Sequence, residues 1–326
     1  MASYIVRRVA GLVPVLLLAA TIVWLFVFYL PGDPARAIAG GERLDPVVLE
    51  SVRQEWGLDA PPARQYVTYL GKLLRGDLGT SYVQRRPVTA IVRDHFPATF
   101  ILAGAAILLS SAAGLVLGAL AAYRRGRVTD ELILLLSLLG ASTPVFWLGL
   151  MLMMVFASRL AWLPPLGYGM NGIVVPLLGV RLPEWEHLVL PALTLSLLSL
   201  GTVARITRAS LLESGNAEYL TTAAAKGASA FRVFARHALK NALLPVVTVV
   251  GLDFASMLGG AVATEYVFAW PGLGKTLVRA IALRDLPLVE GCVIFLTAIF
   301  VLVNLVVDLL YVALDPRVHY EGMAGS

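Results

Sequence analysis

The chain has 326 residues, of which 58% are hydrophobic and 14% are charged, and its formal net charge is +5 at pH 7. Soluble domains carry about 25% charged residues, so this composition excludes most soluble enzymes and disordered proteins and indicates that lipid surrounds much of the chain. The single cysteine, Cys292, excludes an intrachain disulfide and a cysteine-based metal cluster.

Six apolar stretches are long enough to cross a bilayer core of about 30 Å, which takes about 20 helical residues. In chain order they cover 9–30, 98–122, 132–158, 188–205, 242–264 and 288–314. Small residues within them, such as Gly104, Gly114 and Gly118, favour close packing of helices in lipid. The pattern predicts an all-α integral membrane protein with six transmembrane helices in a bundle.

Basic residues concentrate in the short connections on one side of these stretches. With a cytoplasmic N-terminus, the inner connections hold about twelve Lys and Arg residues and the two short outer connections about five, as the positive-inside rule requires. Both termini are therefore expected inside the cell. The excess of positive charge orients the chain, and no nucleic-acid partner is expected.

The segment 31–97, between the first and second stretches, lies outside the cell in this topology. Its polar composition is typical of a small soluble appendage. Apolar spacing predicts two amphipathic helices here, one from Val47 to Trp56 and one from Tyr66 to Leu73. Two interpretations remain open: an ordered loop that caps the bundle, or a docking surface for an external partner.

Proline and charged residues within or near the spans point to the transport pathway. Pro144 and Pro191 are expected to kink their helices and free carbonyl groups to line a cavity. Asp253 places a charge near the centre of the fifth stretch, where charge is costly. It is either a pore-facing carboxylate that attracts a peptide amino terminus or a buried carboxylate bonded to a neighbouring helix. Glu265 and Phe268 are expected to contribute to an outer gate.

The cytoplasmic segment 205–241 predicts two short helices that meet at a corner. An alanine-rich helix would end at Gly227, which tolerates positive φ, and Ser229 can cap the next helix. A basic stripe with four-residue spacing begins at Arg232, and Phe231 would be exposed. This corner suits a groove on a cytoplasmic protein, and the alternative is that the stripe lies on anionic lipid headgroups.

Residues 269–276 partly match a phosphate-binding loop through Gly274, Lys275 and Thr276. The match fails because Ala269 replaces the first glycine, Pro271 lacks an amide N–H and no strand pattern precedes it. The segment also lies outside the cell in this topology, where ATP is absent. We interpret it as a tight turn with an aromatic plug formed by Tyr266, Phe268 and Trp270, and we expect another subunit to hydrolyse ATP.

The sequence contains no recognisable catalytic or metal-binding set. Its four histidines lie far apart without metal-ligand spacing, and no serine sits in a G-x-S-x-G motif. We therefore expect a protein that is not an enzyme and has no cofactor.

Several segments resemble the first permease subunit of the dipeptide/oligopeptide class of binding-protein-dependent ABC importers. Residues 221–245 look like the EAA loop of these permeases, although Thr221 replaces the name-giving glutamate. Six further motifs occur in the family's order, at 4–8, 30–34, 76–81, 141–144, 265–274 and 308–317. Each motif is weak alone, but the ordered set covers nearly the whole chain and is highly specific.

The resemblance implies a type I ABC importer permease fold, with one transmembrane permease domain over 1–326. The segment 31–97 would be an extracytoplasmic loop subdomain after the first helix, and 205–241 an EAA-type coupling loop. The residues implied in ATPase coupling are Thr221, Thr222, Ala223, Lys226, Gly227, Ala228, Ser229, Phe231 and Arg232.

The resemblance also implies the partners and the substrate class. A multi-pass permease in a bacterial cell membrane would form a pathway with a second homologous permease. Two cytoplasmic ATPase subunits would drive import of di- or oligopeptides delivered by an extracytoplasmic substrate-binding protein. Permeases of this pattern also import glutathione or nickel chelates, so the exact substrate stays open. The alternatives from other classes are an ion-coupled secondary transporter, which normally has more spans and intramembrane charge pairs, and a structural membrane scaffold.

Overall fold

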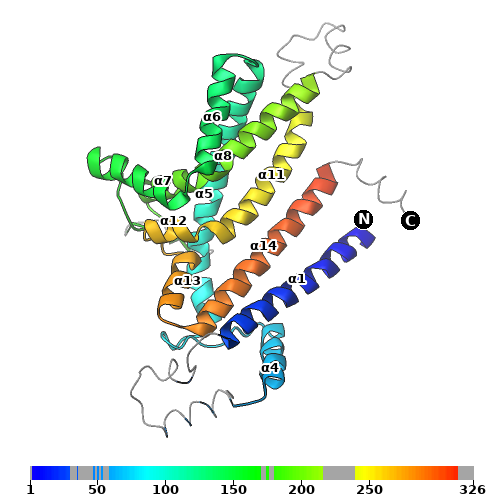
Figure 1. The fold of residues 1–326 in the computed structure, drawn as a ribbon, viewed down its shortest axis with the longest axis vertical. Helices are drawn as coiled ribbons and strands as arrows, with labels where there is room; N and C mark the ends of the chain where they lie inside the picture. Colours follow the sequence, from blue (N-terminus) through cyan, green and yellow to red (C-terminus); the bar gives the residue numbers. More distant parts are fainter. Residues whose placement is uncertain are drawn as a thin grey trace. The chain divides into compact units, whose positions relative to one another are not determined.

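The computed structural model describes residues 2–29, 59–169, 174–175, 180–215 and 239–314, together with Ala35, Val47, Glu50 and Arg53. Helices dominate this part of the chain (Figure 1). Its one sheet is the antiparallel pair of the two-residue strands β1 (Val174–Val175) and β2 (Val180–Arg181). The chain divides into two compact units, each built from two separate stretches of sequence. The first unit comprises Met1–Thr99 and Pro271–Ile299, and the second comprises Phe100–Trp270 and Phe300–Ser326.

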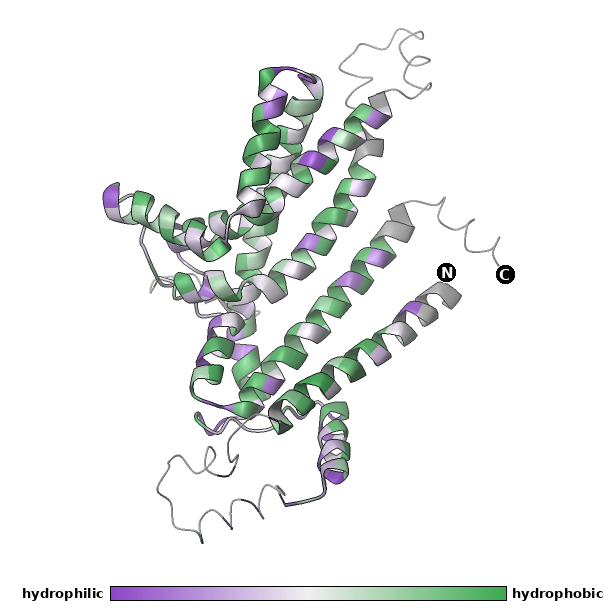
Figure 2. Cartoon of the chain, in the orientation of Figure 1, coloured by the Kyte–Doolittle hydropathy of each residue, from purple (hydrophilic) through white to green (hydrophobic). Residues whose placement is uncertain are grey.

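Each of the six predicted stretches lies on helical structure, and hydrophobic residues cover most of each long helix (Figure 2). The five continuous helices are α1 (Ala2–Phe28), α5 (Val88–Tyr123), α8 (Trp185–Gly215), α11 (Leu239–Gly260) and α14 (Leu286–Leu314). Within the described residues, the last four are long and apolar enough to cross a membrane, and a broken pair makes a fifth candidate. In α1 the apolar part, Ala10–Phe26, is shorter. The prediction of an all-helical membrane protein is confirmed, and the count of six spans stays a prediction.

The third predicted stretch, 132–158, breaks at Pro144, so the kink expected there is confirmed. It is divided into α6 (Val128–Ser142), α7 (Val145–Leu152) and a π-helical segment, η1 (Met153–Arg159). The two arms are bent by 105°. Thr143 adopts an extended backbone, with φ −90° and ψ 134°, because the ring of the following Pro144 clashes with a helical conformation of the preceding residue. In contrast, Pro191 lies near the start of α8 without ending it.

In the second unit, α8 lies between α6 and α11 and packs against both (Figure 1). Glycines set the separation of α8 from α5 and from α6. A Cβ atom on Gly118 of α5 would lie 2.5 Å from the carbonyl oxygen of Ala204 on α8. On the α6 side, a Cβ atom on Gly201 would lie 2.4 Å from the carbonyl oxygen of Ser137. Only hydrogen fits at these contacts, so α5 and α6 hold α8 by close backbone approach.

The first unit contains α1, α4 (Pro62–Leu74), α13 (Leu273–Ala282), the beginning of α5 and the beginning of α14. Its core is a cluster of buried side chains from α5, α13 and α14: Val88, Ile91, Val92, Leu273, Ala280, Leu288, Cys292 and Leu296. The second amphipathic helix predicted for the outer loop is confirmed as α4. Its Tyr66 hydroxyl forms a 2.6 Å hydrogen bond with the Thr21 hydroxyl of α1. The other, from Val47 to Trp56, falls almost wholly outside the described residues.

Substitution of Gly118 tests the close packing of α8. We expect Gly118→Ala to destabilise the protein by about 1–3 kcal/mol, because the added methyl group overpacks a rigid backbone contact. Gly104→Ala on the same helix is the matched control, since a Cβ atom there meets nothing within 4 Å. The control should be neutral or slightly stabilising, because alanine favours a helix over glycine. Thermal unfolding of the detergent-purified protein measures both, and equal melting temperatures would contradict the packing argument.

Candidate functional site

The predicted ATPase-coupling residues all lie outside the described residues. They are Thr221, Thr222, Ala223, Lys226, Gly227, Ala228, Ser229, Phe231 and Arg232. The helices on either side of them are described: α8 ends at Gly215 and α11 begins at Leu239. The candidate site is therefore built from these two helices and from the elements that pack against them.

Asp253 lies half-buried on α11 and bonds to α8. The Ser199 hydroxyl of α8 donates a hydrogen bond to the Asp253 carboxylate. This contact fits the interpretation of a carboxylate bonded to a neighbouring helix. A carboxylate can accept about four hydrogen bonds, and the half-buried side chain leaves room for a further donor. A role in the transport pathway stays a prediction.

Two other buried hydroxyl groups on α8 bond within their own helix. The Thr194 hydroxyl donates to the Leu190 carbonyl oxygen at 2.8 Å, and the Ser196 hydroxyl donates to the Leu193 carbonyl oxygen at 2.8 Å. This back-bonding satisfies a hydroxyl in apolar surroundings without a partner helix. Ser199 differs because it reaches another helix, so its hydrogen bond to Asp253 couples α8 to α11.

A buried ion pair joins α6 to α8, and the sequence analysis did not identify it. Arg208 Nε and Nη2 donate to Asp130 Oδ1 and Oδ2 at 2.6 and 2.7 Å. The Asp130 side chain is 4% exposed and that of Arg208 is 23% exposed. The Gly126 amide also donates to Asp130 Oδ2, at 3.0 Å. The bidentate geometry gives this pair both strength and a fixed orientation.

The ion pair lies close to the predicted coupling segment along the chain. Arg208 precedes the end of α8, at Gly215, by about two helical turns. The pair therefore fixes the part of α8 that leads into the predicted coupling residues. From the sequence, the position of Asp130 in the first turn of a helix indicates only a favourable interaction with the helix dipole. Nothing in the sequence connects it with a residue 78 positions later.

The short helix α12 (Val262–Val267) and the turn after it form a buried plug. Glu265, Phe268 and Trp270 are each at most 1% exposed. The Trp270 amide donates to the Glu265 carbonyl oxygen at 2.8 Å, and Ala269 has a left-handed φ of 52°. The predicted tight turn is confirmed for Phe268 and Trp270, whereas Tyr266 is 61% exposed.

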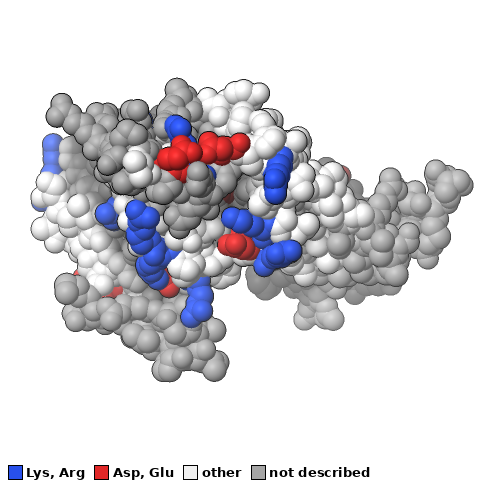
Figure 3. Space-filling view, turned by 90° about the horizontal axis from the view of Figure 1, so that it is seen from below, with Lys and Arg blue, Asp and Glu red and all other residues white. Residues whose placement is uncertain are grey.

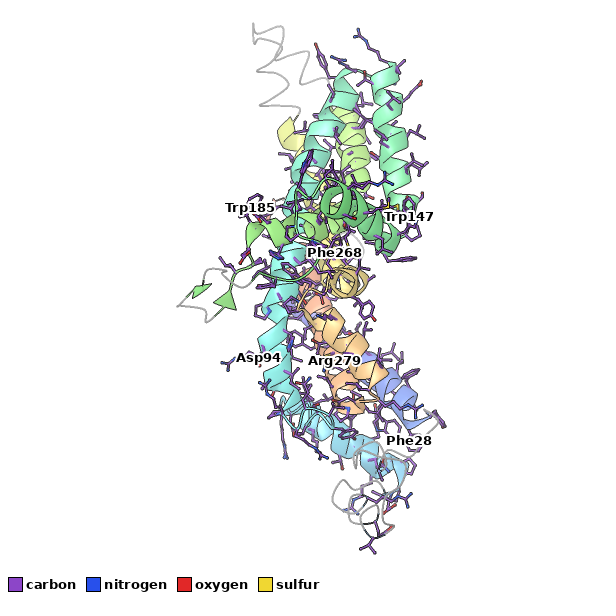
Figure 4. The ribbon with its side chains drawn as sticks, turned by 90° about the vertical axis from the view of Figure 1, so that its left-hand side faces the viewer. Phe28, Asp94, Trp147, Trp185, Phe268 and Arg279 are labelled. Atoms are coloured by element: carbon purple, nitrogen blue, oxygen red, sulfur yellow. The ribbon has the colours of Figure 1, made fainter. Side chains whose placement is uncertain are left out.

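The plug contacts the helix that begins at Pro144. Helix α12 packs against α7 and α8, and a Cβ atom on Gly149 of α7 would lie 3.0 Å from the Phe268 ring. The structure thus brings together the elements that carry three predicted pathway residues, Pro144, Glu265 and Phe268. In Figure 4, Phe268 lies at the level of Trp147 and Trp185.

The loop before α8 closes over the same turn. The Gly167 amide donates to the Phe268 carbonyl oxygen at 2.9 Å. The Tyr168 ring packs on Trp270 with their centroids 4.6 Å apart. Burial raises the pKa of Tyr168 to about 12, so its hydroxyl is neutral at physiological pH. These contacts indicate an ordered structure around the turn. Among the residues that the structure describes, no group of three or more His, Cys, Asp or Glu could hold a metal ion.

Two family models match the chain. "Binding-protein-dependent transport system inner membrane component" matches residues 114–320, and the corresponding N-terminal model matches residues 1–103. The chain is similar to the glutathione transport system permease protein GsiC of Salmonella typhimurium (strain LT2), with 41% identity over 98% of this chain and 100% of that protein. The Escherichia coli (strain K12) protein of the same name is 40% identical over the same shares.

A solved structure has a similar fold. An inward-facing conformation of the MetNI methionine ABC transporter matches with a TM-score of 0.52 and covers 70% of this chain and 97% of that chain. The sequence identity is 16%, so the similarity concerns the fold alone.

A double-mutant cycle tests the ion pair between α6 and α8. We expect Arg208→Ala to destabilise the protein by about 1–3 kcal/mol, because it leaves the buried Asp130 carboxylate without its main donor. Asp130→Ala should also destabilise. The double substitution should cost less than the sum of the two single substitutions, since it removes the unpaired charge. Thermal unfolding in detergent measures the cycle, and strictly additive losses would show that the two side chains do not interact.

Proposed function

The chain belongs to the family of binding-protein-dependent transport system inner membrane components, and we propose that it forms part of a pathway for di- and oligopeptides. Members of this family are permease subunits of bacterial ABC importers. The chain is accordingly a multi-pass inner-membrane transport component and not an enzyme. In the proposed complex it pairs with a second homologous permease. Two ATPase subunits drive import, and an extracytoplasmic substrate-binding protein delivers the peptide.

The observation that carries the proposal is the similarity to importer permeases over 98% of the chain. The ordered motifs described above support the peptide class within that family. The relatives named as glutathione permeases make glutathione the second candidate. Glutathione is itself a small peptide derivative with a free amino group and carboxylates, so the two candidates share much of their chemistry.

The proposed topology has six spans with both termini in the cytoplasm. It counts α1 and the broken α6–α7 pair as spans, in addition to the four long helices. Basic residues in the inner connections support this orientation. The coupling residues between α8 and α11 then face the cytoplasm, and the buried turn from Glu265 to Trp270 lies toward the outside. Family membership disfavours the ion-coupled and scaffold alternatives.

The contacts of α8 suggest how a movement of the coupling segment reaches the pathway. Arg208 ties α8 to α6 through Asp130, and Ser199 ties it to α11 through Asp253. Because α8 also packs against α12, displacement of α8 would act directly on the buried turn. In this proposal α6, α8 and α11 move together when the ATPase subunits close. The outer gate at Glu265 and Phe268 opens or closes with them.

Reconstituted uptake tests the proposed substrate. The complete transporter would be placed in proteoliposomes and supplied with its substrate-binding protein and ATP. We expect ATP-dependent accumulation of labelled di- or oligopeptides, and little accumulation with a non-hydrolysable ATP analogue. Glutathione and a nickel chelate are measured in parallel. Uptake restricted to either of these two would overturn the peptide assignment while leaving the importer function intact.

Asp253 and Ser199 provide a matched pair of variants in the same assay. Asp253→Asn keeps the size of the side chain and one acceptor oxygen for the Ser199 hydroxyl but removes the charge. If the carboxylate attracts the peptide amino group, uptake should fall roughly tenfold, the effect of losing an interaction of about 1.5 kcal/mol. Ser199→Ala removes only the bond between α8 and α11, so it should lower the melting temperature with near-normal uptake. Wild-type uptake by Asp253→Asn would show that the carboxylate has a packing role alone.

A further inference from the structure

A cleft of about 350 Å³ lies in the first unit, beside α13. Helix α13 contributes Lys275, Thr276 and Arg279 to its wall, α5 contributes His95, and the preceding loop contributes Val83 and Gln84. Lys275 and Arg279 are separated by one helical turn and therefore lie on the same face of α13. Two cationic side chains therefore line one wall of a cleft that is large enough for a side chain, and the Asp285 carboxylate also belongs to the lining.

The polar groups around the cleft are held in place. Asp285, 1% exposed, accepts hydrogen bonds from the Ser81 hydroxyl and from the amides of Tyr82 and Val83, the latter two at 2.9 and 3.3 Å. These bonds hold the 81–83 loop against the turn that follows α13. The carboxylate of Asp285 therefore organises the wall of the cleft.

His95 is oriented by its own helix. Its Nδ1 atom lies 2.8 Å from the Ile91 carbonyl oxygen. A carbonyl oxygen only accepts hydrogen bonds, so Nδ1 carries a hydrogen and Nε2 is left as the other polar atom of the ring. His95 thus uses its Nδ1–H within its own helix, and the donors that the lining offers to a carboxylate group are the cationic side chains of Lys275 and Arg279.

The surroundings add further positive charge. Arg85 and Arg284 follow in the two loops beside the cleft, both are exposed, and both have left-handed φ values, of 53° and 54°. The exposed Asp94 on α5 is already paired with Arg86 at 2.7 Å. Lys and Arg side chains recur across the face seen from below, where Asp and Glu side chains are fewer (Figure 3).

We propose that this cleft receives an acidic side chain of the extracytoplasmic substrate-binding protein, with Arg279 as the anchoring residue. The inference rests on the proposed topology, which places α13 and the 75–87 loop outside the cell. Charge complementarity argues for a protein partner, because exposed arginines extend the positive field beyond the cleft and steer a large charged partner toward it. Arginine is also enriched among the residues that dominate binding energy at interfaces.

The test measures docking directly. The complete transporter in nanodiscs is presented to the purified substrate-binding protein of the same system, and Kd is measured at low and high salt. We expect Lys275→Glu/Arg279→Glu to raise Kd by about tenfold or more and to flatten its salt dependence, mainly through a slower association rate. The control is Arg64→Glu/Lys72→Glu on α4, which makes the same charge change at exposed positions outside the cleft. Its Kd should stay close to that of the wild type.

The milder Arg279→Gln variant replaces the double variant if the latter misfolds, and thermal unfolding checks that it is folded. Its Kd should rise in the same direction but by less. Wild-type affinity in both cleft variants would overturn the proposal. An equal loss in the α4 control would also overturn it, because the effect would then be general electrostatics. Competition by free glutamate at constant ionic strength would identify a small-anion site instead of a docking site. Docking by a wild-type complex that imports no peptide would refute the proposed substrate but not this inference.

Discussion

The close approach of α8 to its neighbours is the constraint on which the second unit depends. At Gly118 on α5 and Gly201 on α8, a methyl group would overlap backbone atoms of the facing helix. In lipid, apolar side chains gain little by leaving their surroundings for another helix, so van der Waals contact and polar links must hold the helices together. The glycines allow that contact along α8, and the close approach of α6 and α8 brings Arg208 within reach of Asp130. Ser199 of α8 bonds to Asp253 on α11.

Those two polar links tie α8 to α6 and to α11. A charge in an apolar environment is costly unless a partner compensates it, so each link resists separation of its helices. The Asp130–Arg208 pair lies near the end of α8 that leads into the predicted coupling segment, and the Ser199–Asp253 hydrogen bond lies farther back along the helix. Helix α8 then contacts α12, whose turn buries Glu265, Phe268 and Trp270. A single helix thus touches every described element of the predicted pathway. In the first unit, the buried Asp285 carboxylate organises a loop, whereas Arg279 remains exposed at the cleft.

Much of the fold could be predicted because it depends on local properties of the chain. Apolar stretches of about 20 residues identified the helices, the tyrosine and leucine spacing identified α4, and Pro144 indicated a distortion. The size of that distortion was missed, because proline also constrains Thr143 and the helix stops completely. The tight turn after Glu265 was expected from Pro271 and the glycines. Its burial under Tyr168 was not, since that contact joins segments about a hundred residues apart.

By itself, the sequence determined that this is a helical membrane permease of the binding-protein-dependent type. Composition, apolar stretches and ordered motifs are properties of the chain that can be read without knowledge of its contacts. Only the tertiary structure decided which residues meet. In the folded chain Asp130 pairs with Arg208, and Ser199 bonds to Asp253. Lys275, whose segment partly matches a phosphate-binding loop, lines the cleft beside α13. Such contacts depend on helix separation and rotation, which many side chains set together and no short segment encodes.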